Sequence, residues 1–214
     1  GQIIAGGCLF EGENKMKLLN PIPESKLSRF PFGNIYQEFG ENYKLYFPRF
    51  GIIGHNGIDI TGMNYHGKSV VAAHSGIAVN VYYNKNVGGQ VINIQGDQSD
   101  ANGDVFQTCY GHLIKDSQTV KIGDKVIAGQ EIGKIGNSGF IISGKTIYWG
   151  DAPNQIGSHL HFSVYIFNNG KVKYPNNGFN GAVDPMPYLT GTYEGYFNIF
   201  RTLKDILEKM LRSY

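Results

Sequence analysis

Short hydrophobic runs, many of them alternating with polar residues, follow one another from residue 35 to about residue 190. An alternation of period two is typical of a strand with one buried face, and glycines between the runs favour tight turns. The clearest runs are SVVAAHSGIAVNVYY, GGQVINIQG, DVFQTCYGHLI, KVIAGQEIGKIG and LHFSVYIF. This pattern predicts a mainly β domain over residues 35–190, built from antiparallel strands joined by hairpins.

The two ends of the chain have different patterns. Residues 1–34 are irregular, and NPIPES at 20–25 places two prolines among turn formers, which predicts an arm or linker. Residues 191–214 carry apolar side chains at helical spacing, among them Leu203 and Leu207. This spacing predicts a C-terminal amphipathic α-helix that docks against the same chain or mediates self-association.

The composition argues against two classes of partner. The formal net charge is +2 and 17% of the residues are charged, with Lys and Arg scattered, so no nucleic-acid-binding surface is indicated. No run of about 18 apolar residues occurs, so no membrane-spanning helix is expected. The 30 glycines, 14 tyrosines and 13 phenylalanines are typical of a β-rich chain with many turns.

Two histidines stand one residue apart in GSHLHFSVY, residues 157–165. Leu160 and Phe162 alternate with His159 and His161, so a period of two sends the apolar pair to the core and both imidazoles to the opposite face. Their Cβ atoms then lie about 7 Å apart, because each strand residue adds about 3.3 Å. At that distance one imidazole can bind a metal while the other reaches a ligand held by it.

A second cluster, GHNGIDI, places His55 four residues before Asp59. Gly54 and Gly57 favour a bend that enters a strand. Imidazole nitrogens and carboxylate oxygens both ligate zinc, and a catalytic zinc site combines three protein ligands with one open position. His55, Asp59 and one histidine of the HLH pair are therefore candidate ligands.

The remaining histidines divide into two groups. His112 follows a glycine at the end of an apolar run, in CYGHLI, where a strand end would face an open site. His66 and His74 stand in NYHGKS and AAHSGI, which read as turns without neighbouring ligands. Both are expected to be ordinary surface or core histidines.

The motifs HNGID, YGHL and HLHF, in this order, resemble the signature of the lysostaphin-type (LytM-like) zinc metalloendopeptidases of bacterial cell walls. FGENY before the first motif and AVDPMPYL after the last support the resemblance, which covers roughly residues 35 to 190. It implies an antiparallel β-sheet or sandwich of the duplicated hybrid motif type, with an open groove.

The resemblance also implies roles for five side chains. His55, Asp59 and His161 resemble the ligands of one Zn²⁺ per chain, and His112 and His159 resemble two non-ligand histidines that handle protons and stabilise the developing oxyanion. Such proteins hydrolyse peptide bonds in the stems or cross-bridges of peptidoglycan, so peptidoglycan peptides are the expected partner. Zinc polarises the scissile carbonyl and acidifies bound water, and a nearby imidazole can take the proton at neutral pH.

Four further residues are expected to contact the substrate: Tyr110, Asn137, Tyr148 and Trp149. The last two belong to FIISGKTIYWGDAPNQIG, which is longer and more aromatic than the Thr-Gly turn usual in such proteins. This segment is predicted to form a loop that borders the groove, and the alternative is a surface hairpin without substrate contact.

Two other functions compete with the peptidase. A catalytically silent relative that binds cell wall or activates another hydrolase is expected to lose metal ligands, which this chain keeps. A lipoyl-type carrier or a phosphocarrier shares the hairpin rhythm of IGDKVIAGQEIGKIG, but predicts no bound zinc.

The expected location is outside the cytoplasm, in the wall, the periplasm or the medium, or on a virion. IIAGGC lacks the basic start and long apolar stretch of a leader, so no signal peptide is expected in this chain. Whether a glycine bridge or a D-Ala to diaminopimelate link is cleaved is left open.

Overall fold

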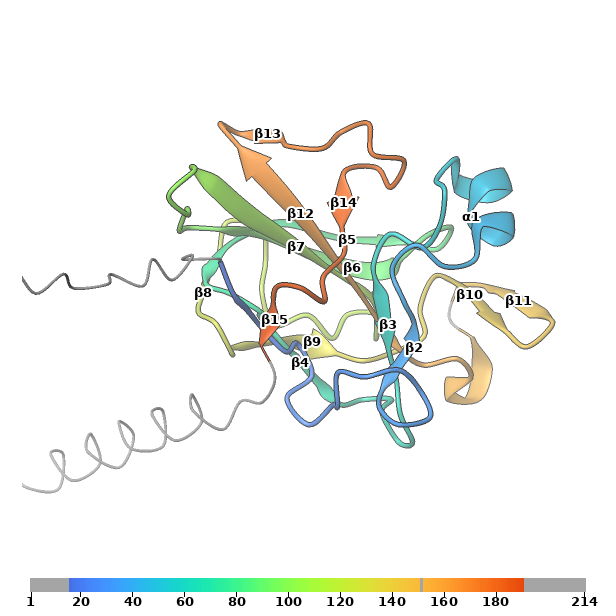
Figure 1. Ribbon diagram of the computed structural model, residues 1–214. Coiled ribbons are helices and arrows are strands. Elements are labelled where there is room, and N and C mark those ends of the chain that lie inside the picture. The colour runs from blue at the N-terminus through green and yellow to red at the C-terminus, as the bar shows by residue number, and fades with distance from the viewer. Residues whose placement is uncertain (1–15, 151, 191–214) are drawn as a thin grey trace, which may run out of the picture.

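Antiparallel β-strands dominate the computed structural model, which describes residues 16–150 and 152–190 (Figure 1). The elements, in chain order, are β1 (Leu18–Leu19), β2 (Ile35–Gln37), α1 (Tyr43–Phe50), β3 (Ile58–Ile60), β4 (Ser69–Val71), β5 (Gly76–Asn84), β6 (Gly89–Gly96), β7 (Asp104–Leu113), β8 (Lys125–Val126), β9 (Glu131–Lys134), β10 (Phe140–Ser143), β11 (Thr146–Trp149), a 3₁₀ turn (Pro153–Gln155), β12 (Leu160–Asn168), β13 (Lys171–Val172), β14 (Ala182–Val183) and β15 (Leu189–Thr190). The predicted mainly β class is confirmed. The predicted helix over residues 191–214 lies outside the described residues, and the duplicated hybrid motif stays a prediction.

One nine-stranded sheet forms the body of the domain. Strands β2, β3, β12, β7, β6, β5 and β8 lie side by side in that order, and β13 and β14 also pair with β12. All of these pairings are antiparallel, as are those of β4 with β9 and β10 with β11. The parallel pair β1–β15 joins segments from the two ends of the described chain.

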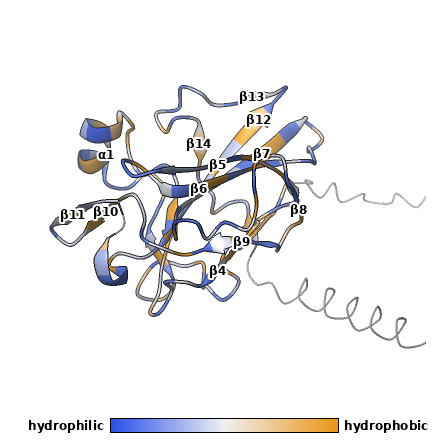
Figure 2. Cartoon of the chain, turned by 180° about the vertical axis from the view of Figure 1, so that it is seen from behind, coloured by the Kyte–Doolittle hydropathy of each residue, from blue (hydrophilic) through white to orange (hydrophobic). Residues whose placement is uncertain are grey.

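The core lies between the large sheet and the small β4–β9 pair. On β12, Leu160, Phe162 and Val164 are fully buried, as the alternation predicts, and they share one cluster with Val70 of β4 and Ile132 of β9. Figure 2 shows hydrophobic stretches on β7 and β12 in the middle of the sheet. Burial of this face leaves the opposite face of β12 free to carry polar side chains.

The predicted arm over residues 1–34 needs correction in its described part. Leu18 and Ile22 are fully buried, and both belong to the main core cluster. The Leu18 amide donates to the Tyr188 carbonyl oxygen at 2.9 Å, which ties this segment to β15. The domain therefore begins well before residue 35, because its core recruits apolar residues that show no strand periodicity.

Helix α1 was not anticipated by the hydrophobic pattern. Its flanking residues, Asn42 and Gly51, both adopt the left-handed conformation, and Pro48 lies inside its eight residues. None of its residues is buried, although Tyr43 stacks on Phe47 and Tyr46 packs on Phe50 along one side of the helix. Over the residues the structure describes, no helix is long and apolar enough to cross a membrane.

Candidate metal centre and active site

Sheet register brings the three predicted metal ligands together. Asp59 of β3 lies directly opposite His161 of β12 in the antiparallel ladder. His55 is on the bend that precedes β3, as the glycines around it predict. A Cβ atom on Gly57 would lie 2.6 Å from the Phe162 carbonyl oxygen, so this close approach of the bend to β12 requires glycine.

The donor atoms of the three side chains form a tight triangle. Asp59 Oδ1 lies 3.1 Å from His55 Nε2 and 3.1 Å from His161 Nδ1, and the two nitrogens are 2.8 Å apart. A tetrahedral zinc site with bonds of about 2.1 Å separates its ligand atoms by about 3.4 Å. The triangle therefore fits one zinc ion after a slight expansion.

The protonation states also suit a divalent cation. Burial acts to raise the pKa of the Asp59 carboxyl, but the surrounding imidazoles of His55, His159 and His161 outweigh it and hold that pKa well below its usual range. Burial lowers the pKa of His161, against the effect of Asp59. An ionised carboxylate beside a neutral imidazole is the form in which these groups ligate a metal.

Hydrogen bonds on the far side of each imidazole orient the rings. His55 Nδ1–H donates to the Glu38 carbonyl oxygen at 3.2 Å, which leaves Nε2 to face Asp59. His161 Nε2 hydrogen-bonds the Ser163 hydroxyl at 2.8 Å, which leaves Nδ1 for the centre. Outer partners of this kind fix the ring and the tautomer of metal-binding histidines.

His112 and His159 lie next to the triangle without joining it. Their ring centroids are 4.5 Å apart, and His159 Nε2 is 3.7 Å from Asp59 Oδ1. His112 Nδ1–H donates to the Ser138 carbonyl oxygen at 2.8 Å, and His159 Nδ1–H donates to the Gly157 carbonyl oxygen at 2.7 Å. These bonds leave the Nε2 atom of each ring for other partners. Burial, together with the neighbouring imidazoles, lowers the pKa of His112 to about 3, so this ring is neutral.

A β-bulge aims His112 at the centre. Gln90 pairs with Leu113 and Ile92 pairs with Tyr110, so one residue of β6 opposes two residues of β7. His112 has a φ of 59°, the left-handed region that non-glycine residues rarely adopt. Without the bulge, the alternation would send His112 to the same core face as Tyr110.

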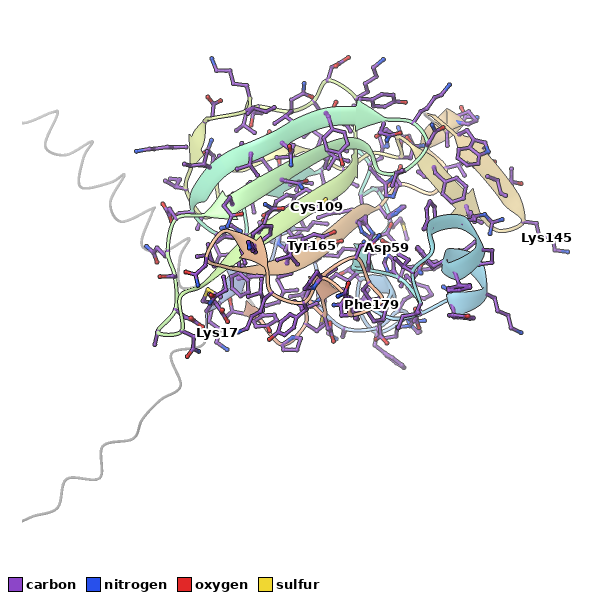
Figure 3. All side chains as sticks on the ribbon, turned by 90° about the horizontal axis from the view of Figure 1, so that it is seen from above. Lys17, Asp59, Cys109, Lys145, Tyr165 and Phe179 are labelled. Atoms are coloured by element: carbon purple, nitrogen blue, oxygen red, sulfur yellow. The ribbon has the colours of Figure 1, made fainter. Side chains whose placement is uncertain are left out.

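Two adjoining cavities form a groove over the centre, and Asp59 and His159 line both. The first cavity has a volume of about 210 Å³ and runs between α1 and β10, where Tyr46, Phe50 and Phe140 line it. The second has a volume of about 420 Å³ and more polar lining groups. Figure 3 shows Asp59 at the end of the sheet nearest α1, with Lys145 at the tip of the β10–β11 hairpin on the same side of the molecule.

Comparison with known proteins places this arrangement in a family. The family model for peptidase family M23 matches residues 53–175, more than half of the chain and all five histidine and aspartate positions of the centre. The chain belongs to peptidase family M23.

Several solved structures are similar over 64% to 80% of the chain. A zinc-containing peptidase from Vibrio cholerae is 26% identical with a TM-score of 0.50, and the match covers 80% of this chain and 40% of that one. The catalytic domain of lysostaphin from Staphylococcus simulans is 30% identical with a TM-score of 0.42, covering 64% of this chain and 79% of that one. The prophage-encoded M23 protein EnpA from Enterococcus faecalis, as a catalytic-domain mutant, is 22% identical with a TM-score of 0.46, covering 72% and 90%.

The chain thus spans about 40% of the length of the Vibrio cholerae peptidase. No curated protein sequence matches it. Membership of the M23 family does not favour the carrier-domain alternative.

Two of the four predicted substrate contacts need correction. Tyr110 is fully buried, and its hydroxyl oxygen accepts hydrogen bonds from the Ala73 amide at 2.7 Å and the Thr108 hydroxyl at 3.0 Å. Asn137 is 6% exposed, and its side-chain amide donates to the carbonyl oxygens of residues 152 and 156 at 2.9 and 3.0 Å. Both side chains are buried and line neither cavity of the groove, so they stabilise the fold around it.

The hairpin of the aromatic segment borders the groove through its other strand. Tyr148 and Trp149 lie on β11 and line neither cavity, whereas Phe140 and Ile142 of β10 do. Trp149 is 61% exposed and packs on Phe140 with ring centroids 4.6 Å apart. The predicted loop therefore borders the groove. Its wall is formed by Phe140 and Ile142 of β10, and not by Tyr148 and Trp149.

Two groove residues were not assigned to the site by the sequence analysis. Tyr46 packs its ring 5.4 Å from that of His55, and its hydroxyl accepts a hydrogen bond from Gln37 at 3.2 Å. Burial raises the pKa of Tyr46, so its hydroxyl stays protonated. His66 lines the second cavity and hydrogen-bonds the Ser158 hydroxyl at 2.8 Å. No local motif marks these positions, because the groove assembles them from separate loops. His74 hydrogen-bonds Thr108 away from the groove, as expected for a structural histidine.

Proposed function

We propose that this chain is a zinc-dependent endopeptidase that hydrolyses peptide cross-links or stem peptides of bacterial peptidoglycan, outside the cytoplasm or as part of a virion. The observation that carries the proposal is the His55, Asp59 and His161 triangle in a groove, with His112 and His159 beside it. Membership of family M23 and the similarity to a zinc-containing peptidase support the metal and the reaction. The resemblance of the motifs to cell-wall endopeptidases supplies the substrate class.

One zinc ion per chain would be held by His55 Nε2, an oxygen of Asp59 and His161 Nδ1. When bound, zinc supplies Lewis acidity, which polarises a carbonyl group and lowers the pKa of water. Asp59 contributes a negative charge that offsets the charge of the cation within a largely buried site. The groove leaves room above the triangle, as a catalytic site with an open coordination position requires.

His159 is best placed for proton transfer. Its Nδ1–H is committed to the Gly157 carbonyl oxygen, so Nε2 can take a proton and later give it to the leaving amine. The Asp59 carboxylate oxygen lies 3.7 Å from that nitrogen, so the transferred proton stays next to the centre.

His112 has a different environment. It is 9% exposed, and its Nδ1–H is held by the Ser138 carbonyl oxygen, so its Nε2 offers an acceptor to a water or a substrate N–H. The Ser138 hydroxyl in turn accepts from the Gln90 amide at 2.9 Å, which fixes the support of His112. This group orients reactants by hydrogen bonding while His159 moves the proton.

Zinc content and peptide release test the proposal together. The purified protein should carry one zinc per chain and release peptides with new amino termini from peptidoglycan, as read by mass spectrometry on walls of both cross-link types. Asp59→Ala should lose stoichiometric zinc and activity. His159→Ala should keep zinc and lower turnover by roughly 100-fold, the scale for a general acid-base group.

A control histidine variant completes the experiment. His74→Gln, at a position outside the groove, should retain both zinc and peptide release. Full zinc retention in Asp59→Ala would refute the ligand assignment. A zinc-loaded wild-type protein that releases nothing from either wall type would favour the silent relative instead.

A further inference from the structure

A row of polar side chains continues from the metal centre along β12. His161, Ser163 and Tyr165 stand two residues apart, so strand alternation places all three on the face opposite the core. Ser163 is 1% exposed, and Tyr165 is partly buried. The strand is paired on both sides here, since Tyr165 lies opposite Gln107 of β7 and Ala182 of β14. The row therefore has a backbone that is held in the middle of the sheet.

Hydrogen bonds link this row back to the bend that carries another predicted ligand. His161 Nε2 lies 2.8 Å from the Ser163 hydroxyl oxygen. The Tyr165 hydroxyl hydrogen-bonds the side chains of both Ser163 and Asn56. Asn56 directly follows His55 on the bend before β3. We call Ser163, Tyr165 and Asn56 the outer network, which starts at one predicted metal ligand and ends beside another.

The close approach of Gly57 to β12 makes this closure possible. A Cβ atom on Gly57 would lie 2.7 Å from the Ser163 hydroxyl oxygen and 2.9 Å from His161 Cε1. Both distances are shorter than van der Waals contact, so glycine is required for the bend to pack directly against the hydrogen bond between His161 and Ser163. This packing brings Asn56, the residue before Gly57, within reach of the Tyr165 hydroxyl.

The donors and acceptors of the outer network match the state of a metal-binding imidazole. An imidazole that offers Nδ1 to a metal carries its hydrogen on Nε2, so His161 Nε2–H donates to the Ser163 oxygen. The Ser163 hydroxyl can then donate to the Tyr165 oxygen, and the Tyr165 hydroxyl to the side-chain oxygen of Asn56. Each hydroxyl hydrogen has an acceptor in this arrangement. The outer network thus holds the ring with neutral groups and adds no charge to the centre.

We propose that Tyr165 and Asn56 are positioning residues of the metal centre. They act through Ser163, which holds the His161 ring with Nδ1 towards the other two ligands. This inference rests on the proposed function, because it assumes that the triangle holds zinc. Removal of an outer partner of a metal ligand typically weakens metal binding by about 10–100-fold. The competing interpretation is that the outer network stabilises the fold alone.

Zinc affinity of single variants tests the outer network. Competition with a chromophoric chelator measures the dissociation constant of Zn²⁺ for the purified protein. Ser163→Ala should weaken zinc binding by about 10–100-fold. Tyr165→Phe and Asn56→Ala leave the first hydrogen bond in place, so each should weaken it by about tenfold, the lower end of that range. Tyr174→Phe, at a 42% exposed position beyond β13, should bind zinc like the wild type.

A double variant separates positioning from general stability. Removal of either Tyr165 or Asn56 interrupts the same network. The combination of Tyr165→Phe with Asn56→Ala should therefore bind zinc no more weakly than the weaker single variant, because contacting residues of one network are not additive. A role in stability alone would lower the thermal unfolding midpoint of the metal-free protein and leave the dissociation constant of zinc unchanged.

The outcomes distinguish failure of the outer network from failure of the proposed function. Losses that multiply in the double variant would overturn the outer network, as would wild-type zinc affinity in folded Tyr165→Phe and Asn56→Ala. These two variants decide the question even where Ser163→Ala does not fold. A wild-type protein that binds no stoichiometric zinc would instead defeat the proposed function. Zinc affinities in the expected order, without release of peptides from peptidoglycan, would support the outer network and overturn the proposed reaction.

Discussion

The buried hydroxyl of Tyr110 gives a sharp test of how β7 is arranged. Its oxygen accepts from the Ala73 amide at 2.7 Å and from the Thr108 hydroxyl at 3.0 Å, and the donors are 1% and 0% exposed. In Tyr110→Phe the ring stays in the core, but both buried donors lose this acceptor. Thr108 keeps its contact with His74, so the main loss is the unsatisfied Ala73 amide.

An unsatisfied buried donor costs about 1–3 kcal/mol. For about 2 kcal/mol, a domain of this size should lose roughly 4–8 °C of its unfolding midpoint. Thermal unfolding followed by circular dichroism measures the shift, and peptide release at 25 °C should show kcat and KM close to wild type.

Tyr82→Phe is the matched control, because Tyr82 is 48% exposed and should show no change in midpoint. An unchanged midpoint in Tyr110→Phe, combined with a raised KM, would refute the core placement and return Tyr110 to the substrate.

Two further predictions concern residues that support the domain. Asn137→Ala removes one buried and one partly buried hydrogen bond to the segment after β11. It should therefore lower the free energy of unfolding by about 1–3 kcal/mol and speed limited proteolysis between residues 150 and 158; resistance equal to wild type would contradict this role. Burial acts to raise the pKa of the Asp104 carboxyl, but its hydrogen bonds with Lys173 and Asn168 outweigh burial and lower that pKa from its usual value. A carboxylate whose pKa is lowered by folding stabilises the fold at pH values above its unfolded pKa, and this contribution is lost as the group is protonated at lower pH. Lys173→Met should therefore be less stable than wild type at pH 7. The difference in urea midpoint between the two proteins should shrink as the pH falls below about 4. A difference that is the same at pH 7 and pH 3 would exclude this ion pair as its source.

The period-two alternation of the sequence accounts for the correct assignment of β12 side chains to the two faces of the sheet. Alternation is a property of any strand with one buried face, so it assigns Leu160 and Phe162 to the core and His161 to the other face without further information. It did not anticipate α1, an eight-residue helix with a proline inside it and no buried residue, although its aromatic residues recur at helical spacing. Nor could it include Leu18 and Ile22 in the core, because they lie in an irregular segment.

The division between sequence and structure is clearest at Tyr110 and His112. The chain itself specifies the strands, the bend at HNGID and the pair of imidazoles on one face of β12, since these follow from side-chain alternation and glycine conformation. Strict alternation would place Tyr110 and His112 on the same side of β7. Only the pairing with β6 produces the bulge that keeps Tyr110 in the core and turns His112 into the groove, because a bulge depends on two strands and their register. The meeting of Phe50 with Phe140 likewise depends on tertiary structure, since it joins segments that no local pattern relates.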